Sequence, residues 1–255
     1  MIAALQLTDI AVRFGGVQAV DGVSLVIEAG QFVGLIGPNG AGKTTLIRIV
    51  AGAVRADRGR VLLGGTDITD MRTASRIRKG MALTHQMVRP FREVTALDNV
   101  ALAAGYLRTS SPLRAILHVR QNRERERAAD IMVQVGLGGV GSKLAGSLPL
   151  GQMKRLEVAR ALAVEPKLIV CDEVVSALDV SVQAQIVNLL QDLQDELGLS
   201  YLFISHDLAV VEHISHDVVV MFRGQIVERA DAVSIYTHPQ HDYTRNLLAS
   251  VPSLS

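Results

Sequence analysis

The segment that most constrains the fold is GPNGAGKTT at residues 37–45, which matches the pattern G-x-x-x-x-G-K-[ST]. It follows an apolar run that predicts a buried strand, and residues 43–51 predict a helix that stops at Gly52. A glycine-rich turn between a strand and a helix brings backbone N–H groups and the positive end of the helix dipole to one point. The sequence therefore predicts a phosphate-binding loop.

The side chains of this loop suit a nucleoside triphosphate with Mg²⁺. We expect Lys43 to reach the β- and γ-phosphates and the Thr44 hydroxyl to bind Mg²⁺. A nucleoside triphosphate and Mg²⁺ are therefore the expected cofactors, and the family resemblance given below makes the nucleotide ATP. The candidate nucleotide-binding residues of the loop are Gly37, Pro38, Asn39, Gly40, Ala41, Gly42, Lys43, Thr44 and Thr45.

Acidic and polar residues follow the strands expected beside this loop. The run LIVCDE ends in Asp172, which we expect to hold Mg²⁺, and in Glu173, which we expect to accept a proton from an attacking water. His206 ends the next strand, so it should open onto the same crevice and donate to the γ-phosphate. Gln86 ends another short strand and is expected to touch the water or Mg²⁺, although without that context it reads as an ordinary loop residue.

Strand and helix signals alternate along most of the chain and predict an α/β fold with a mostly parallel sheet. The strand signal over 23–37 is broken at Ala29-Gly30. Between 95 and 163 the strand signals stop and apolar residues recur at helical spacing, which predicts an inserted helical subdomain. The other expected strands and hairpins cover 5–14, 59–69, 80–85, 167–173, 200–207 and 217–230, and a further helix covers 182–198.

Bulk properties exclude several classes of protein. The formal net charge of +1 argues against a protein whose main task is to grip nucleic acid or anionic lipid. There is no run of 18 apolar residues, and the N-terminus lacks the basic start of a secretory signal. The single cysteine, Cys171, fits a reducing cytoplasm. Arginines crowd residues 113–127, where we expect a solvated helix face with i,i+3 and i,i+4 ion pairs.

These motifs, in this order, resemble the ATP-binding cassette (ABC) ATPases, the motor subunits of ABC transporters, over essentially the whole chain. The resemblance makes Gln86 the Q-loop, Asp172-Glu173 the Walker B motif with its catalytic base, SALD at 176–179 the D-loop, and His206 the switch histidine. Phe14 stands where the family keeps an aromatic that stacks on adenine, and its alternative is an ordinary apolar strand residue.

The resemblance also implies an ABC-type P-loop NTPase architecture in a single domain. An α/β core with an N-terminal antiparallel β subdomain is expected from residues 1–94 and 164–230. A helical subdomain is expected over 95–163, and a C-terminal helical tail over 231–255.

Residues 148–152, LPLGQ, lie where the family places its signature loop, usually LSGGQ. In the family two cassettes dimerise head to tail, and the signature of one closes on the γ-phosphate held by the other. Gly151 and Gln152 are the implied contacts, at the start of a helix expected over 152–163. Pro149 and Leu150 replace the usual serine and glycine, which predicts a weak contact and a low ATPase rate.

The transported substrate is ambiguous within this resemblance. Residues 1 to about 167 resemble branched-chain amino acid importer ATPases, and the remainder resembles dipeptide and oligopeptide importer ATPases. We expect an ATP-hydrolysing importer subunit that energises branched-chain amino acid uptake, because the permease-docking segment, 86–110, lies in the first half. A peptide importer subunit is the alternative. A further alternative is a soluble ABC protein that takes no part in transport, or an ABC protein that is catalytically weak.

The implied partners follow from the same resemblance. They are a second ABC ATPase subunit, identical or different, and transmembrane permease subunits, with a substrate-binding protein acting indirectly and no nucleic acid. The implied location is the cytoplasmic face of the inner membrane, as a peripheral subunit. Permease docking is expected against Val88, Phe91 and Val94.

Overall fold

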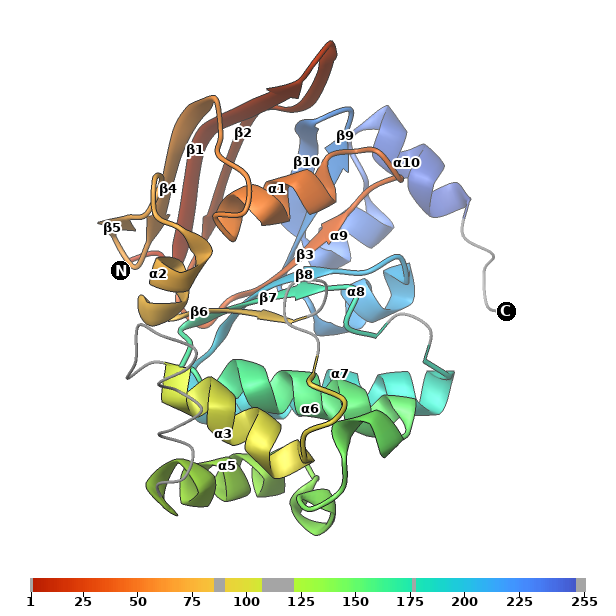
Figure 1. The fold of residues 1–255 in the computed structure, drawn as a ribbon. Helices are drawn as coiled ribbons and strands as arrows, with labels where there is room; N and C mark the ends of the chain where they lie inside the picture. Colours follow the sequence, from red (N-terminus) through yellow and green to blue (C-terminus); the bar gives the residue numbers. More distant parts are fainter. Residues whose placement is uncertain (1, 85–89, 107–121, 176–177, 251–255) are drawn as a thin grey trace.

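Two β-sheets and the helices packed on them make up the fold in this computed structural model, which describes residues 2–84, 90–106, 122–175 and 178–250 (Figure 1). The N-terminal sheet is antiparallel, in the order β2-β1-β4-β5. Its strands are β1 (Leu5–Phe14), β2 (Val17–Ile27), β4 (Arg58–Leu63) and β5 (Thr66–Asp67).

The larger sheet has the order β10-β9-β3-β8-β7-β6 and is parallel except for the β9–β10 hairpin. Its strands are β3 (Phe32–Ile36), β6 (Met81–Thr84), β7 (Leu168–Asp172), β8 (Ser200–Ile204), β9 (Asp217–Phe222) and β10 (Gln225–Asp231). Both faces of its central strands are buried. In β3, for example, Val33 and Leu35 enter one core while Phe32 and Ile36 enter the other.

Helix α1 (Lys43–Val50) lies between the two sheets (Figure 1). Its apolar residues pack with the apolar faces of both sheets in the first core, the one that contains Val33 and Leu35. The second core lies on the opposite face of the larger sheet, which α6 and α7 help to cover (Figure 1). The remaining α-helices are α2 (Thr73–Arg78), α3 (Ala96–Tyr106), α5 (Asn122–Gln134), α6 (Leu150–Leu162), α7 (Val180–Leu197), α8 (Leu208–Ile214), α9 (Ala232–Thr237) and α10 (Asp242–Ala249).

The register of the larger sheet brings three loops to one edge. Ile204, the last residue of β8, pairs with Leu35 of β3 and with Asp172 of β7. The three strands therefore end at the same level, and the segments that follow them are Gly37 onward, Glu173 onward and Ser205 onward. This edge holds the site that the sequence predicts.

The predicted α/β class, with an antiparallel N-terminal sheet, a mostly parallel sheet and a helical segment, is confirmed. Some boundaries were wrong. The predicted break at Ala29-Gly30 does separate β2 from β3, but β2 begins at Val17 because Gly15 and Gly16 turn the chain into a hairpin with β1. Helices α2 and α8 were not expected. The division into 1–94 with 164–230, 95–163 and 231–255 stays a prediction.

The arginine-rich segment is an exposed helix face at Arg123 and Arg125, as predicted, but the two ion pairs below differ from the predicted ones. Arg125 forms an ion pair with Asp98 at 3.1 Å, and Arg127 contacts Glu165. Both partners lie outside α5, so these arginines tie α5 to α3 and to the loop after α6 rather than to their own helix. Residues 113–121 lie outside the described residues.

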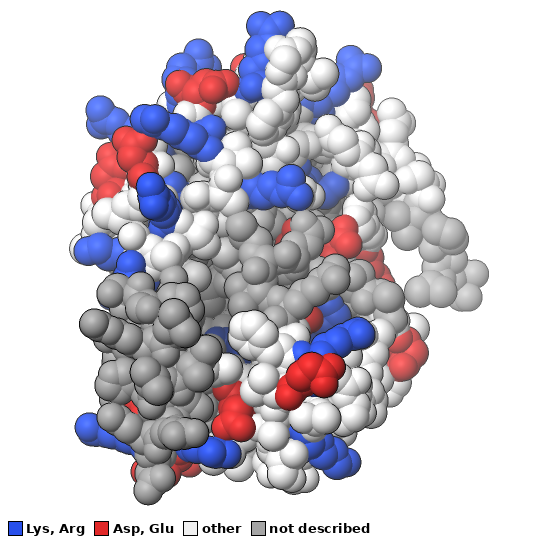
Figure 2. All heavy atoms as spheres, in the orientation of Figure 1, with Lys and Arg blue, Asp and Glu red and all other residues white. Residues whose placement is uncertain are grey.

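Charges of both signs are interspersed over the described part of the face in Figure 2. Within the described ranges, none of the helices combines the length and the apolar character needed to cross a bilayer.

Candidate nucleotide site

Close contacts fix the course of the loop at residues 37–45. Gly37 has φ 144°, and a Cβ there would lie 2.2 Å from the carbonyl oxygen of Met221. Gly42 has φ 102°, and a Cβ there would lie 2.4 Å from the carbonyl oxygen of Ala19. Both positions combine left-handed backbone with no room for a side chain, so only glycine fits. β2 and β9 therefore hold the loop from both sides.

Lys43 is the first residue of α1, and its side chain curls back over the loop. Nζ donates to the carbonyl oxygens of Gly37 at 2.6 Å and Pro38 at 2.8 Å, and the residue is 6% exposed. Burial lowers the pKa of the Lys43 ammonium, and the negative charges of Glu173 and Asp172 act in the opposite direction. The ammonium and the two carboxylates therefore face the same space.

The two acids at the end of β7 differ in their environments. Asp172 is 5% exposed and is the last residue of the strand. Glu173 is the next residue and adopts φ 54°, a left-handed conformation that is uncommon for glutamate, while its N–H donates to the carbonyl oxygen of Ile204 at 3.0 Å. Glu173 thus leaves the strand through a backbone conformation that costs energy, a feature often found at functional sites.

Glu173 and His206 meet across the ends of β7 and β8. Oε1 of Glu173 lies 2.6 Å from Nε2 of His206, and both side chains remain partly exposed. The prediction that His206 opens onto the same crevice as the acidic pair agrees with this contact. The loop, the acidic pair and the histidine thus converge, although Lys43 is separated from Asp172 by more than a hundred residues of sequence.

The residues expected to hold Mg²⁺ fit that ion. Mg²⁺ prefers oxygen ligands and usually takes one or two carboxylates together with substrate phosphates. Asp172 supplies a carboxylate at the edge where the loop begins, and Thr44, in the first turn of α1, is exposed. Gln86, the third expected ligand, lies outside the described residues, as do Val88, Ser176 and Ala177.

The LPLGQ segment begins its helix earlier than predicted. α6 starts at Leu150 with Pro149 as its N-cap, so Gly151 and Gln152 lie within the first turn rather than before it. Proline is well suited to a helix start because its missing N–H would have no partner there. A Cβ on Gly151 would lie 2.7 Å from Cγ1 of Val182, so this glycine also lets α6 pack against the first turn of α7.

Phe14 lies at the end of β1 and is 52% exposed. It pairs with Val17 on β2, the strand whose Ala19 carbonyl contacts Gly42. An exposed aromatic ring on a hairpin that touches the loop is consistent with stacking on a base. Its alternative, an ordinary apolar strand residue, also agrees with the position of Phe14 at the end of β1, so the stacking role stays a prediction.

Two supporting contacts were not anticipated from the sequence. The Asp207 carboxylate caps α8 and also accepts from Nε2 of Gln183 at 2.8 Å, which links the residue after His206 to α7. The N–H of Gly224 donates to the carbonyl oxygen of Ala41 at 2.9 Å, which links the β9–β10 turn to the loop. An aspartate before a helical run signals the cap. Neither long-range partner has a sequence signal.

Comparison with protein families matches residues 20–176 to the family described as ABC transporter. A probable peptide ABC transporter ATP-binding protein of Sinorhizobium fredii is 42% identical over 92% of this chain and 66% of its own length. The oligopeptide transport ATP-binding protein OppD of Mycobacterium bovis is 41% identical over 93% of this chain and 38% of its own length. The chain thus spans less than two thirds of these two relatives. OppF of Escherichia coli is 42% identical over 92% of this chain and 70% of its own length.

Solved structures with the same fold are ATP-binding cassettes. The ADP conformation of an ATP-binding cassette of an ABC transporter superposes with a TM-score of 0.85 at 30% identity, over 98% of this chain and 100% of that one. A nucleotide-free ATP-binding cassette from an ABC transporter gives 0.82 at 31% identity, over 97% and 95%. The ABC-type core that the sequence predicted is confirmed.

Proposed function

The chain belongs to the ABC transporter family, and on that premise we propose that it is the ATP-binding and ATP-hydrolysing subunit of an importer. One observation carries the proposal. Lys43, Asp172 and the Glu173–His206 pair converge at the carboxyl edge of the parallel strands, beside a glycine loop that opens a helix. Cation, metal ligand and general base then act on one bound phosphate chain.

Each residue has a separate task in this mechanism. The N–H groups of residues 40–45 and the Lys43 ammonium bind the phosphates. Asp172 and Thr44 hold Mg²⁺, which supplies charge neutralisation for the phosphates. Glu173 accepts the proton of the attacking water, and His206 orients Glu173 and donates to the γ-phosphate. Gln86 stays a proposed contact of the water or metal. Phe14 stacks on the adenine.

A second cassette completes the site in this proposal. The first turn of α6, with Gly151 and Gln152, faces the γ-phosphate of a partner cassette and contributes its helix dipole and an amide. Leu150 is an exposed apolar residue on that turn. Without the serine hydroxyl that the family usually has, closure of the dimer is weak until a partner subunit supports it.

For the imported substrate we propose a peptide. The relatives from Sinorhizobium, Mycobacterium and Escherichia are named for peptide or oligopeptide transport, and the similarity covers more than nine tenths of this chain. This favours the peptide-importer alternative over our first prediction of branched-chain amino acid uptake. The permease subunits, a substrate-binding protein and the peripheral location on the inner membrane follow from the importer proposal.

The ATPase proposal is tested by substituting the loop lysine. Lys43→Ala removes the side-chain cation of the loop and should abolish Mg·ATP binding, measured by calorimetry on the purified chain. Arg48→Ala is a matched control, because Arg48 lies on the same helix and is exposed. Unchanged ATP binding and hydrolysis in Lys43→Ala would show that residues 37–45 are not the nucleotide site.

Transport is tested by isolating the protein with its partners from its own cells. Co-purification with peptide permeases, and ATP turnover that rises in their presence, would support the peptide importer. Co-purification with branched-chain amino acid permeases would restore the first prediction. Isolation without any membrane partner, with turnover that peptide or amino acid permeases do not raise, would support a soluble ABC protein.

A further inference from the structure

The C-terminal tail contacts the turn that supports the phosphate loop. The rings of Tyr243, on α10, and Phe222, at the end of β9, stack with centroids 4.0 Å apart and planes 18° apart. The guanidinium of Arg223 lies 5.0 Å from the centroid of the same Phe222 ring. The last residue of β9 is thus held by the tail immediately before the β9–β10 turn.

That turn is short, and its backbone is hydrogen-bonded to the loop at residues 37–45. Arg223 and Gly224 form a two-residue turn with φ values of 49° and 82°. Gly224 donates its N–H to the Ala41 carbonyl at 2.9 Å and accepts from the N–H of Asp21 at 2.8 Å. Gln225 adds a bond from Nε2 to the Asp21 carboxylate at 2.9 Å. A two-residue turn has little slack, so a shift of Phe222 moves Gly224.

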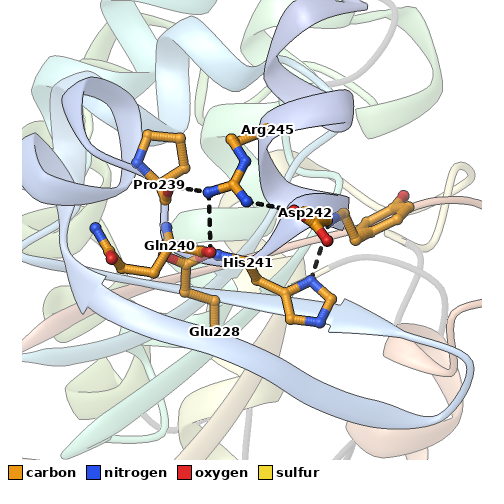
Figure 3. A network of polar contacts seen from close by, with 7 residues as sticks. Glu228, Pro239, Gln240, His241, Asp242 and Arg245 are labelled. Carbon is orange, nitrogen blue, oxygen red and sulfur yellow. Dashed lines mark hydrogen bonds and ion pairs between the residues drawn. The ribbon is translucent and has the colours of Figure 1, made fainter.

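A second set of contacts, from Glu228 on β10 and within the tail itself, holds the segment before α10 (Figure 3). The Glu228 carboxylate accepts from the backbone N–H groups of Gln240 at 2.7 Å and His241 at 3.0 Å. Arg245 donates to the carbonyl oxygens of Pro239 and Gln240, both at 3.0 Å, and pairs with Asp242. Nδ1 of His241 accepts from the N–H of Tyr243 at 3.1 Å. The segment before α10 is therefore fixed, and with it the position of the Tyr243 ring.

We propose that Tyr243 is a positioning residue for the nucleotide site, acting through Phe222 and the Gly224–Ala41 hydrogen bond, so that tail docking and nucleotide binding are coupled. This rests on the proposed function, because it assumes that residues 37–45 bind ATP. Coupling between two sites is reciprocal. A docked tail favours nucleotide binding, and a bound nucleotide favours tail docking to the same extent.

The size of the effect follows from the stacked pair. Aromatic pairs of this geometry contribute enough to change an equilibrium about two- to ten-fold beyond the burial of their surface. Tyr243→Ala should therefore weaken binding of Mg²⁺ with adenylyl imidodiphosphate, a non-hydrolysable ATP analogue, by about two- to ten-fold. Tyr243→Phe keeps the ring and should bind like the parent.

The experiment measures affinity by calorimetry on the full chain with four proteins: the parent, Tyr243→Ala, Tyr243→Phe and Asn246→Ala. Asn246 is exposed on the same helix and is the matched control. Phe222→Ala, alone and combined with Tyr243→Ala, completes a double-mutant cycle. The double variant should lose no more affinity than the larger single loss.

Hydrogen exchange supplies a readout that needs no variant. In the parent protein, the analogue should slow exchange of the Gln240 and His241 amide hydrogens, which Glu228 holds. The positioning role would be overturned if Tyr243→Ala bound the analogue with the same affinity as the parent. It would also be overturned if the analogue did not change the exchange rates of the Gln240 and His241 amide hydrogens. Either result would leave the ATPase proposal intact. If the parent binds no analogue, the proposed function is wrong and the positioning role is wrong with it.

Discussion

Nε2 of His206 lies 2.6 Å from Oε1 of Glu173, across the ends of neighbouring strands β8 and β7. Glu173 is held from two sides, because its own N–H is bound by the Ile204 carbonyl on the strand that leads to His206. The position of the proposed base therefore depends on the histidine. Loss of either side chain should affect hydrolysis more than nucleotide binding.

Glu173→Gln should bind Mg·ATP like the parent and hydrolyse it about 10²–10⁴-fold more slowly, because an amide cannot accept the proton. His206→Ala should also slow turnover, since Glu173 loses its orienting contact. Calorimetry and phosphate release measure the two steps separately. The Glu173→Gln protein should also accumulate as an ATP-held dimer in size-exclusion chromatography. A parental turnover rate in Glu173→Gln would remove this residue from the site.

The double variant Pro149→Ser with Leu150→Gly should raise the basal ATPase rate of the isolated chain. It recreates the usual family loop and supplies a hydroxyl at the N-cap of α6, while Gly151 and its contact with Val182 stay unchanged. Val133→Ala, an exposed apolar change on α5, is the control. If the double variant hydrolyses ATP at the parental rate, the start of α6 does not contact the phosphate.

Phe91 presents an exposed ring on a fixed backbone. The ring is 55% exposed, while Asn99 binds both the N–H of Phe91, at 2.8 Å, and its carbonyl, at 3.0 Å. The Arg160 guanidinium lies 5.5 Å from the ring centroid. An aromatic group already held in place loses little entropy on binding, which suits an interface anchor.

Phe91→Ala should weaken assembly with the permease subunits by about 1–3 kcal/mol and leave ATP binding intact. Co-purification at graded salt concentrations, compared with Leu197→Ala as an exposed apolar control, measures the change. Assembly equal to that of the control would place the docking surface elsewhere.

Arg76 fixes the end of α1 opposite to the phosphate loop. It is 2% exposed and donates to the carbonyl oxygens of Ile49, Val50, Thr69 and Met71 at 2.7–2.8 Å. Burial lowers the pKa of its guanidinium, and the charges of Asp70 and Asp67 oppose that shift. The buried guanidinium thus donates to two carbonyl groups at the end of α1 and to two in the segment before α2.

Arg76→Met should lower the free energy of unfolding by about 3 kcal/mol, because it removes the buried side-chain donor that these carbonyl groups share. Urea unfolding followed by circular dichroism measures it. Arg78→Met is the control on the same helix, since Arg78 is exposed, and should change stability by no more than about 0.5 kcal/mol. Equal losses in the two variants would contradict the role of Arg76.

Tail docking should depend on pH through Glu228. Burial raises the pKa of this carboxyl, but the hydrogen bonds that it accepts from the tail, with the charge of His241, outweigh burial and lower the pKa below its ordinary value of 4.5. The docked tail therefore binds fewer protons at Glu228 than the undocked tail. Its stabilisation is present above pH 4.5 and is lost as the pH falls through the lowered pKa.

Exchange of the Gln240 and His241 amide hydrogens, corrected for intrinsic rates, should accelerate in the parent as the pH falls from about 6 toward about 3, through the lowered pKa of Glu228. In Glu228→Gln it should be fast at both ends of that range, because the neutral amide is a weaker acceptor. Near-ultraviolet circular dichroism confirms that the core stays folded. Protection in the parent that does not change with pH would contradict the role of Glu228.

Local patterns determined much of this protein. Apolar alternation predicted β1, a continuous apolar run predicted β7, and the pattern over 217–230 predicted the β9–β10 hairpin, because all of these are properties of adjacent residues. The phosphate loop is equally local, since its glycines, lysine and threonine are contiguous. Motif order and the family resemblance then supplied Asp172, Glu173 and His206 before any contact between them was visible.

Tertiary structure decided the rest, because strand order and register are set by packing between distant segments. The approach of His206 to Glu173 requires β8 to lie beside β7, and the support of Ala41 by Gly224 requires β9 to lie beside β3. The close approach of α6 to α7 at Gly151 and Val182 likewise joins segments that are distant in sequence. The stacking of Tyr243 on Phe222 joins two residues whose neighbours carry no shared pattern, so only the folded chain brings them together.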